Sequence, residues 1–142
     1  IARGATELAY KRIEPYLSEY MGKVFEEICK QYLWKQLLSG NCPVEFSSLG
    51  RWWGNNPLQK CQTEIDIMGE QDKNTALFCE CKWTNEKVDL SVLETLVKRS
   101  KLFNYNNVHL YLFSKCGFTK GCIEEADKMG NVTLVSFADI IA

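Results

Sequence analysis

The sequence lacks any long apolar run, and this absence bears on its location. No stretch approaches the roughly 20 apolar residues that are needed to cross a bilayer, and residues 1–4 do not begin a signal peptide's apolar segment. We therefore expect a cytoplasmic chain with no membrane partner. The chain also begins without methionine and opens directly in a helical pattern, so we expect a fragment of a longer protein.

Neither sign of charge is in excess, and closely spaced cysteines are scarce. The net charge of −1 gives no global electrostatic reason to bind nucleic acid, so any such site must be a local basic patch. The seven cysteines are odd in number and scattered through apolar stretches, which disfavours a disulfide framework. Structural zinc usually requires two close pairs, whereas the only close pair is Cys79 and Cys81. We predict reduced thiols, with structural zinc as a disfavoured alternative.

The chain contains neither an internal repeat nor a nucleotide-binding loop. Gly50 and Gly54 lack the Lys-Ser/Thr pair that follows the glycines of a P-loop, so this chain itself should not bind ATP. Its 142 residues match one domain of ordinary size, and a composition with 46% hydrophobic and 25% charged residues is that of a folded protein. We predict a single domain over residues 1–142.

The hydrophobic period changes along the chain, which predicts the fold class. Spacings of three and four residues predict helices at 5–17 and 19–38, which Pro15 kinks or divides, and later at 89–102, 120–129 and 137–141. Strands are predicted at 44–49, 64–68, 76–83, 108–113 and 132–135, with a loop at 49–59. The polar turn at 69–74 predicts an antiparallel hairpin, and helices between the later strands predict parallel pairing. The fold is thus a mixed α/β sheet flanked by helices.

Charged side chains interrupt two of the predicted strands. Alternate side chains share one face of a strand, so Glu80 and Lys82 point the same way. If the two strands pair as a hairpin, Asp66 stands next to Glu80. Two carboxylates beside a lysine make a hard-oxygen pocket suited to Mg²⁺, and the lysine would orient or activate the attacking water. This pattern predicts phosphodiester hydrolysis.

An acidic residue ending one strand and Glu-x-Lys on the next resemble the signature of the PD-(D/E)XK nuclease superfamily. The resemblance covers about residues 20–115 and implies a restriction-endonuclease-like core of one helix, three strands, a helix and a strand, here followed by further helix and strand elements. It also implies an acidic residue on the first helix, where Glu26 is the assignment and Glu27 its competitor. Catalysis would then rest on Asp66, Glu80, Lys82 and Glu26, with Mg²⁺ or Mn²⁺ held by Asp66, Glu80 and Glu26. Ile65 stands where the superfamily's name has proline, which removes no ligand.

A narrower resemblance rests on four blocks in order: residues 22–26, 50–54, 64–67 and 80–83. Together they resemble a domain of unknown function found C-terminal to archaeal-type ATPases. This resemblance implies DNA as a partner and an ATPase domain in the full-length protein. The sequence is also compatible with a homodimer.

Plainer interpretations stand beside these. Glu80 and Lys82 could form a surface ion pair on an edge strand, which is worth only ~0–1 kcal/mol. The tryptophans at 52, 53 and 83 could pack in the core or stack on bases, and the basic residues at 98, 99 and 101 could contact phosphates or face solvent. His109 lies in an apolar strand and is interpreted as a sheet histidine. The alternative function is a catalytically silent module that binds nucleic acid or protein.

Overall fold

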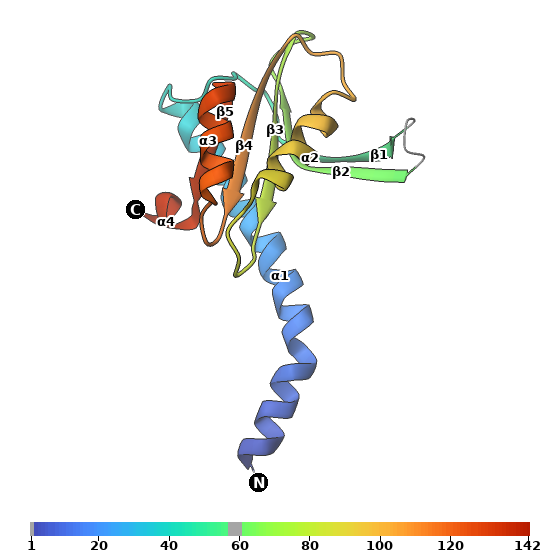
Figure 1. Cartoon of the computed structure of the whole chain (residues 1–142), viewed down its shortest axis with the longest axis vertical. Coiled ribbons are helices and arrows are strands. Elements are labelled where there is room, and N and C mark those ends of the chain that lie inside the picture. The colour runs from blue at the N-terminus through green and yellow to red at the C-terminus, as the bar shows by residue number, and fades with distance from the viewer. Residues whose placement is uncertain (1, 57–60) are drawn as a thin grey trace.

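The computed structural model describes residues 2–56 and 61–142, which form one five-stranded sheet with helices on both faces (Figure 1). The elements are, in chain order, α1 (Ala2–Leu38), β1 (Gly50–Asn56), β2 (Cys61–Glu70), β3 (Thr75–Lys82), α2 (Leu90–Ser100), β4 (Asn107–Ser114), α3 (Lys120–Met129), β5 (Val132–Ser136) and α4 (Phe137–Ile141). The predicted mixed α/β fold is confirmed.

The sheet has the order β1-β2-β3-β4-β5 and changes direction at its centre. β1, β2 and β3 are antiparallel neighbours, which confirms the predicted hairpin around residues 69–74. β4 and β5 add in parallel to β3, because α2 and α3 carry the chain back across the sheet. β3 is therefore the central strand, covered by neighbours on both sides.

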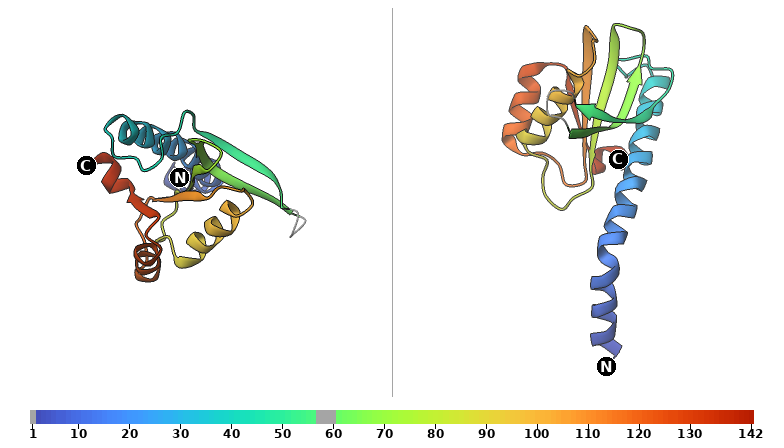
Figure 2. Two further views of the ribbon diagram at one scale, coloured as in Figure 1. Left: turned by 90° about the horizontal axis from the view of Figure 1, so that it is seen from above. Right: turned by 90° about the vertical axis from the view of Figure 1, so that its right-hand side faces the viewer.

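Each face of the sheet carries its own apolar cluster. On one face, α1 packs through Phe25, Cys29 and Leu33. On the other face, α2 and α3 pack through Leu93, Leu96 and Cys122, among others. Figure 2 shows these two layers on opposite sides of the sheet. Alternation along β3 sends Cys79 to the α1 side and Phe78 to the α2 side, as the period of a strand requires.

The later helices begin and end as their sequence predicts. The hydroxyl of Thr119 accepts a hydrogen bond from the backbone N–H of Cys122 and so caps the start of α3. Gly130 ends that helix with φ 77°, a left-handed conformation that favours glycine. Ser136 and Asp139 form a capping box at the start of α4.

The first helix differs from its prediction. α1 runs without a break from Ala2 to Leu38, and Pro15 lies inside it rather than dividing it. Its first half projects away from the sheet (Figures 1 and 2). Proline removes one intrahelical hydrogen bond, a loss that is cheapest where the helix faces water, and residues 4–20 are all exposed.

The predicted strand at 44–49 is wrong. Val44 and Phe46 are buried and Glu45 is exposed, so the alternation of burial is real, but the backbone pairs with no strand. The N–H of Glu45 instead donates to the side-chain oxygen of Gln71 at 2.9 Å. Period-two burial arises here from a loop that folds over the sheet.

The predicted loop at 49–59 is also wrong, because β1 occupies Gly50–Asn56; residues 57–60 lie outside the described part of the chain. Gly54 suggested a turn but has a packing role. A Cβ atom added there would lie 2.8 Å from the indole ring of Trp52, so glycine allows this ring to cross the strand.

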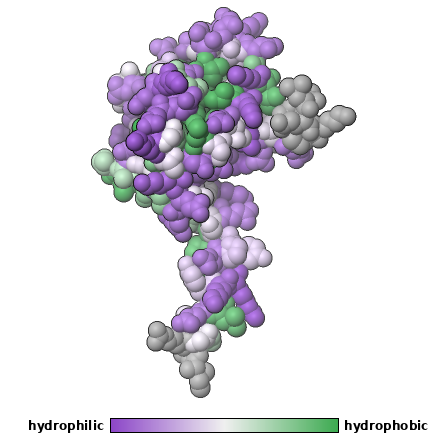
Figure 3. Space-filling model, in the orientation of Figure 1, coloured by the Kyte–Doolittle hydropathy of each residue, from purple (hydrophilic) through white to green (hydrophobic). Residues whose placement is uncertain are grey.

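Large apolar side chains are exposed along the projecting half of α1, where Figure 3 shows hydrophobic residues between polar ones. Leu8, Ile13 and Tyr16 are each more than half exposed. Within the described residues, no helix combines the length and apolarity that a membrane span requires.

Candidate active site

An open pocket of about 590 Å³ lies where the sheet meets α1 and α2. Its lining residues are Glu26, Arg51, Gln62, Thr63, Glu64, Asp66, Glu80, Cys81, Lys82 and Arg99. The pocket thus brings together the four residues that the sequence nominated, from α1, β2 and β3. Glu27 is absent from this lining and forms an ion pair with Lys30 at 2.8 Å on the exposed side of α1, so geometry favours Glu26 as the acidic residue of the first helix.

The pocket forms because the backbone pairing between β2 and β3 ends at this point. Their pairing register ends at Ile67 and Cys79, and before Ile67 the strand β2 pairs only with β1. Beyond that end, the N–H of Cys81 donates to Oδ2 of Asp66 at 2.9 Å. The Asp66 carboxylate thereby replaces a ladder bond, which holds its side chain between the strands and beside Glu80.

Glu80 is a buried carboxylate with two cationic partners. Its side chain is 9% exposed, with Lys82 Nζ 3.4 Å from Oε1 and an Arg99 guanidinium nitrogen 3.3 Å from Oε2. Burial raises the pKa of Glu80 to about 7, and the negative charge of Asp66 adds to this rise, while Lys82 and Arg99 oppose it. The interpretation as a surface pair on an edge strand is wrong, since β3 is central and Glu80 is buried.

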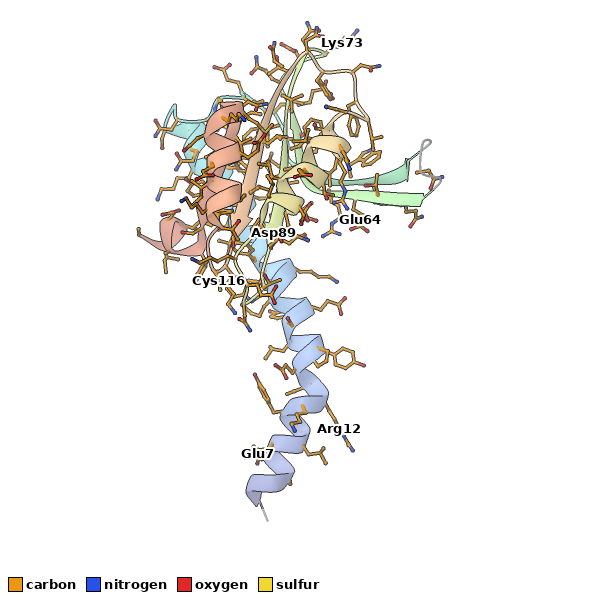
Figure 4. All side chains as sticks on the ribbon, viewed as in Figure 1. Glu7, Arg12, Glu64, Lys73, Asp89 and Cys116 are labelled. Atoms are coloured by element: carbon orange, nitrogen blue, oxygen red, sulfur yellow. The ribbon has the colours of Figure 1, made fainter. Side chains whose placement is uncertain are left out.

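Arg51 crosses the pocket from β1. Its guanidinium forms ion pairs with Glu26 on α1 and, at 3.0 Å, with Glu64 on β2. The hydrogen bond to Glu26 raises the pKa of Arg51 above its ordinary value. The register of β1 with β2 shifts between Gly50 and Trp52, where Asp66 and Ile67 of β2 lie opposite Arg51 alone. The bulge therefore lies on β2, and it re-aims the side chains of that strand beside the pocket. Figure 4 labels Glu64, which lies below the β1–β2 hairpin in that view.

The pocket holds four carboxylates and three cationic groups, a formal balance of 3 − 4 = −1. The carboxylates are Glu26, Glu64, Asp66 and Glu80, and the cations are Arg51, Lys82 and Arg99. Among the residues that the structure describes, no three of the His, Cys, Asp or Glu type are grouped closely enough to hold a metal ion. Asp66 and Glu80 nevertheless converge, and Mg²⁺ is commonly bound by one or two carboxylates together with waters and phosphate oxygens. This donor pair fits such an ion.

Six residues that line the pocket were not nominated from the sequence as site residues, and two of them, Arg51 and Arg99, are cations that contact nominated carboxylates. Arg51 stood within the motif block 50–54, but its partner Glu26 is 25 residues away. Arg99 was considered as a contact for phosphates or as part of a solvent-facing basic surface. It follows Leu93 and Leu96 at helical spacing, a signal that it faces the sheet, and it contacts Glu80 there.

The tryptophans divide between the two interpretations. Trp52 packs on Phe103 with ring centroids 4.9 Å apart, and Trp83 packs on Phe25 at 5.0 Å, so both serve the core. Trp53 is 66% exposed. His109 hydrogen-bonds the hydroxyl of Thr133 on the neighbouring strand at 2.7 Å, which confirms it as a sheet histidine.

Comparison with known sequences gives one family and one curated relative. The profile of DUF234, described as archaeal and bacterial proteins of unknown function, matches residues 1–99. An uncharacterized protein of Methanocaldococcus jannaschii, MJECL04, is 28% identical over 104 residues, which are 71% of this chain and 22% of that protein. The chain thus spans about 22% of the length of the curated relative that it matches.

Two solved structures align with this chain. The MspJI restriction endonuclease, in complex with a 27-mer oligonucleotide, aligns over 96% of this chain and 29% of its own, with a TM-score of 0.51 and 12% identity. The protein of unknown function AF1548 aligns over 78% of this chain and 58% of its own, with a TM-score of 0.46 and 18% identity. At 12% identity the likeness to MspJI concerns the fold alone, which is shared with a restriction endonuclease.

Proposed function

This chain belongs to the DUF234 family of archaeal and bacterial proteins, and we propose that it is a metal-dependent nuclease domain that hydrolyses DNA phosphodiester bonds. One observation carries the proposal. A buried Glu80 stands beside Asp66 and Lys82 in an open pocket, at the point where two strands of the central sheet separate. A sheet needs no such charges for its stability, because burying them costs free energy that an apolar side chain would not.

Each acidic or basic residue of the pocket has its own role in the proposed hydrolysis. Asp66 and Glu80 would hold Mg²⁺ or Mn²⁺, with Glu26 as a third ligand once its carboxylate leaves Arg51. The ion would supply positive charge to the phosphate that is attacked. Lys82 orients the attacking water and offsets the negative charge that builds on the phosphate oxygens. Hydrolysis adds this water across one P–O ester bond and leaves a phosphate monoester and a hydroxyl group.

Arg99 has a positioning part in this scheme. Its guanidinium lies 3.3 Å from Oε2 of Glu80, while Lys82 approaches Oε1. The two contacts fix the plane of the carboxylate, which also faces Asp66. Arg99 thus holds a ligand in place without touching the reacting atoms.

The proposed partners are DNA, an ATPase domain in the full-length protein and a second copy of the chain, all in the cytoplasm. The fold shared with a restriction endonuclease supports DNA. The resemblance of four sequence blocks to domains that follow archaeal-type ATPases supports the second partner. Apolar side chains exposed on α1 support the third, since pairing of two copies would cover them.

A second candidate has its own supporting observation. Every acidic side chain proposed as a ligand already has a polar partner: Arg51 for Glu26, the Cys81 N–H for Asp66, and Lys82 and Arg99 for Glu80. Such mutual pairing is what a silent module that binds nucleic acid or protein needs. In the nuclease a metal ion would displace these partners from the carboxylates, whereas in the silent module the pairs would stay in place.

The test is to titrate Mg²⁺ and Mn²⁺ into the full chain by calorimetry and to follow nicking of supercoiled plasmid in parallel. We expect Asp66→Ala to lose metal binding and cleavage together. Lys82→Ala should retain metal binding and lose cleavage. Glu27→Ala and Lys120→Ala are matched controls, because both side chains are exposed and lie off the pocket. A native chain that neither binds metal nor cuts, with all variants equally folded, would establish the silent module instead.

A further inference from the structure

The β1–β2 hairpin extends beyond the rest of the sheet (Figure 1). Only Ile67–Glu70 of β2 pair with β3, while Cys61–Ile65 pair with β1 alone. This part is a two-stranded ribbon that begins at the pocket and leads away from it. Its exposed length calls for an explanation, since an isolated two-stranded ribbon is only marginally stable in water.

The two faces of this ribbon have different chemistry. On one face Trp52 packs on Phe103, and Ile65 is fully buried beneath it. This packing anchors the ribbon to the α2 side of the sheet. On the other face Trp53 lies directly opposite Glu64, whose carboxylate accepts a hydrogen bond from Arg51. Trp53 and Arg51 are two residues apart on β1, so they share the face that continues into the pocket.

The neighbours of Trp53 indicate what this face can bind. Its indole is 66% exposed, whereas Asn55, Gln62 and Glu64 around it are polar and also exposed. A large contiguous apolar patch would mark this face for a protein partner, and its described residues do not form one. One exposed indole among polar groups, with cations further along, instead matches a strand of nucleic acid, whose bases stack on aromatic rings and whose phosphates bind guanidinium groups.

We propose that this face is an arm that binds an unpaired DNA strand, with Trp53 stacked on one base and Arg51 on a neighbouring phosphate. The strand then enters the pocket toward Lys82, so the substrate class is DNA with unpaired bases. In a duplex both faces of each base are already covered, and a single indole on a ribbon has no base face to meet. The inference rests on the proposed function, because it names the substrate of the same pocket.

Binding is measured by fluorescence anisotropy on the full chain with EDTA present, so that no cleavage occurs. The probes are a labelled oligodeoxythymidylate of about 16 nucleotides and a blunt duplex of the same length. We expect Trp53→Ala to weaken binding of the single strand by about tenfold and to leave duplex binding within about twofold. Trp53→Phe keeps an aromatic face and should lose less than about threefold. Tyr16→Ala removes an aromatic ring that is at least as exposed but lies on α1, and it should leave the binding of both probes unchanged.

A second readout follows the indole itself. The single strand should quench tryptophan fluorescence in the native chain, and Trp53→Phe should abolish most of that quenching. Three outcomes would each overturn the proposed arm. Trp53→Ala could lose equal affinity for the single strand and the duplex, it could lose no affinity at all, or the native chain could fail to bind the single strand. Because these measurements need neither metal nor cleavage, the arm can stand if the nuclease activity fails, and it can fail while plasmid nicking persists.

Discussion

At the scale of single residues, the burial of Glu80 makes the free energy of unfolding depend on pH. Its pKa rises from an ordinary 4.5 to about 7 in the folded chain. Between these values the folded state keeps a proton that the unfolded state releases. The free energy of unfolding therefore falls as pH rises from about 4.5 to about 7, by about 3 kcal/mol, and the loss is complete above pH 7.

Glu80→Gln should remove this dependence. We expect the variant to gain stability relative to the native chain as pH rises from 5 to 8, by up to about 3 kcal/mol, since glutamine carries no charge to bury. Urea unfolding in metal-free buffer at several pH values measures the difference. Glu94→Gln, at an exposed position on α2, is the control and should follow the native curve. Parallel curves for Glu80→Gln and the native chain would contradict the raised pKa.

The sequence indicated the acidic residues and the lysine of the pocket better than its arginines. Glu80 and Lys82 are two residues apart, and the turn at 69–74 makes Asp66 their neighbour, so local periodicity was enough to group these three. Arg51 and Arg99 depend on contacts across 25 and 19 residues. No spacing rule connects residues that only the packing of α1 and α2 brings to the sheet.

At the scale of elements, the buried residues that anchor α1 to the sheet lie in its second half. Leu33 is fully buried against the sheet, whereas Leu38 on the same helix is 84% exposed. We expect Leu33→Ala to lower the free energy of unfolding by about 2–5 kcal/mol and Leu38→Ala to leave it within about 0.5 kcal/mol. Chemical denaturation of both variants tests this. Equal effects would mean that α1 is not held by the contacts described.

Pro15 gives a second prediction for this helix. Residues 4–20 are exposed, so their helical state is coupled only weakly to the sheet. We expect Pro15→Ala to increase the helical circular dichroism signal, because a missing backbone N–H is restored, while the midpoint of thermal unfolding stays nearly constant. Pro43→Ala, in the loop after α1, is the comparison and should not raise helicity. A large rise in the unfolding midpoint would show that the whole helix folds with the sheet.

Element prediction failed where a pattern had two physical causes. Alternating burial of Val44 and Phe46 comes from a loop packed on the sheet, not from a strand. Glycines 50 and 54 resembled a turn, although Gly54 makes space for the Trp52 ring within a strand. Where the helical spacing of apolar residues was unambiguous, as in α3 and α4, the predicted bounds match those observed.

At the scale of the whole molecule, the net charge of −1 leaves the salt dependence of binding to the few cations that contact phosphates. Two cations of the pocket are proposed to do so, Arg51 and Lys82, while Arg99 holds Glu80. Since each phosphate contact on a single strand contributes about −0.7 to the slope of log K against log salt, we expect a slope of roughly −1.4. Anisotropy titrations with a single strand at several salt concentrations measure it. Arg51→Gln should make the slope shallower by about 0.7, and a native slope near −5 would require contacts beyond these two.

The continuity of α1 has a mechanical consequence. At about 1.5 Å per residue its 37 residues span about 55 Å, and its buried contacts with the sheet lie near Phe25, Cys29 and Leu33. Glu26 follows Phe25 on this helix, while Asp66 and Glu80 belong to strands of the sheet. A tilt imposed on the projecting half of α1 would therefore move one acidic group of the pocket relative to the other two, and it would do so from a point far outside the pocket.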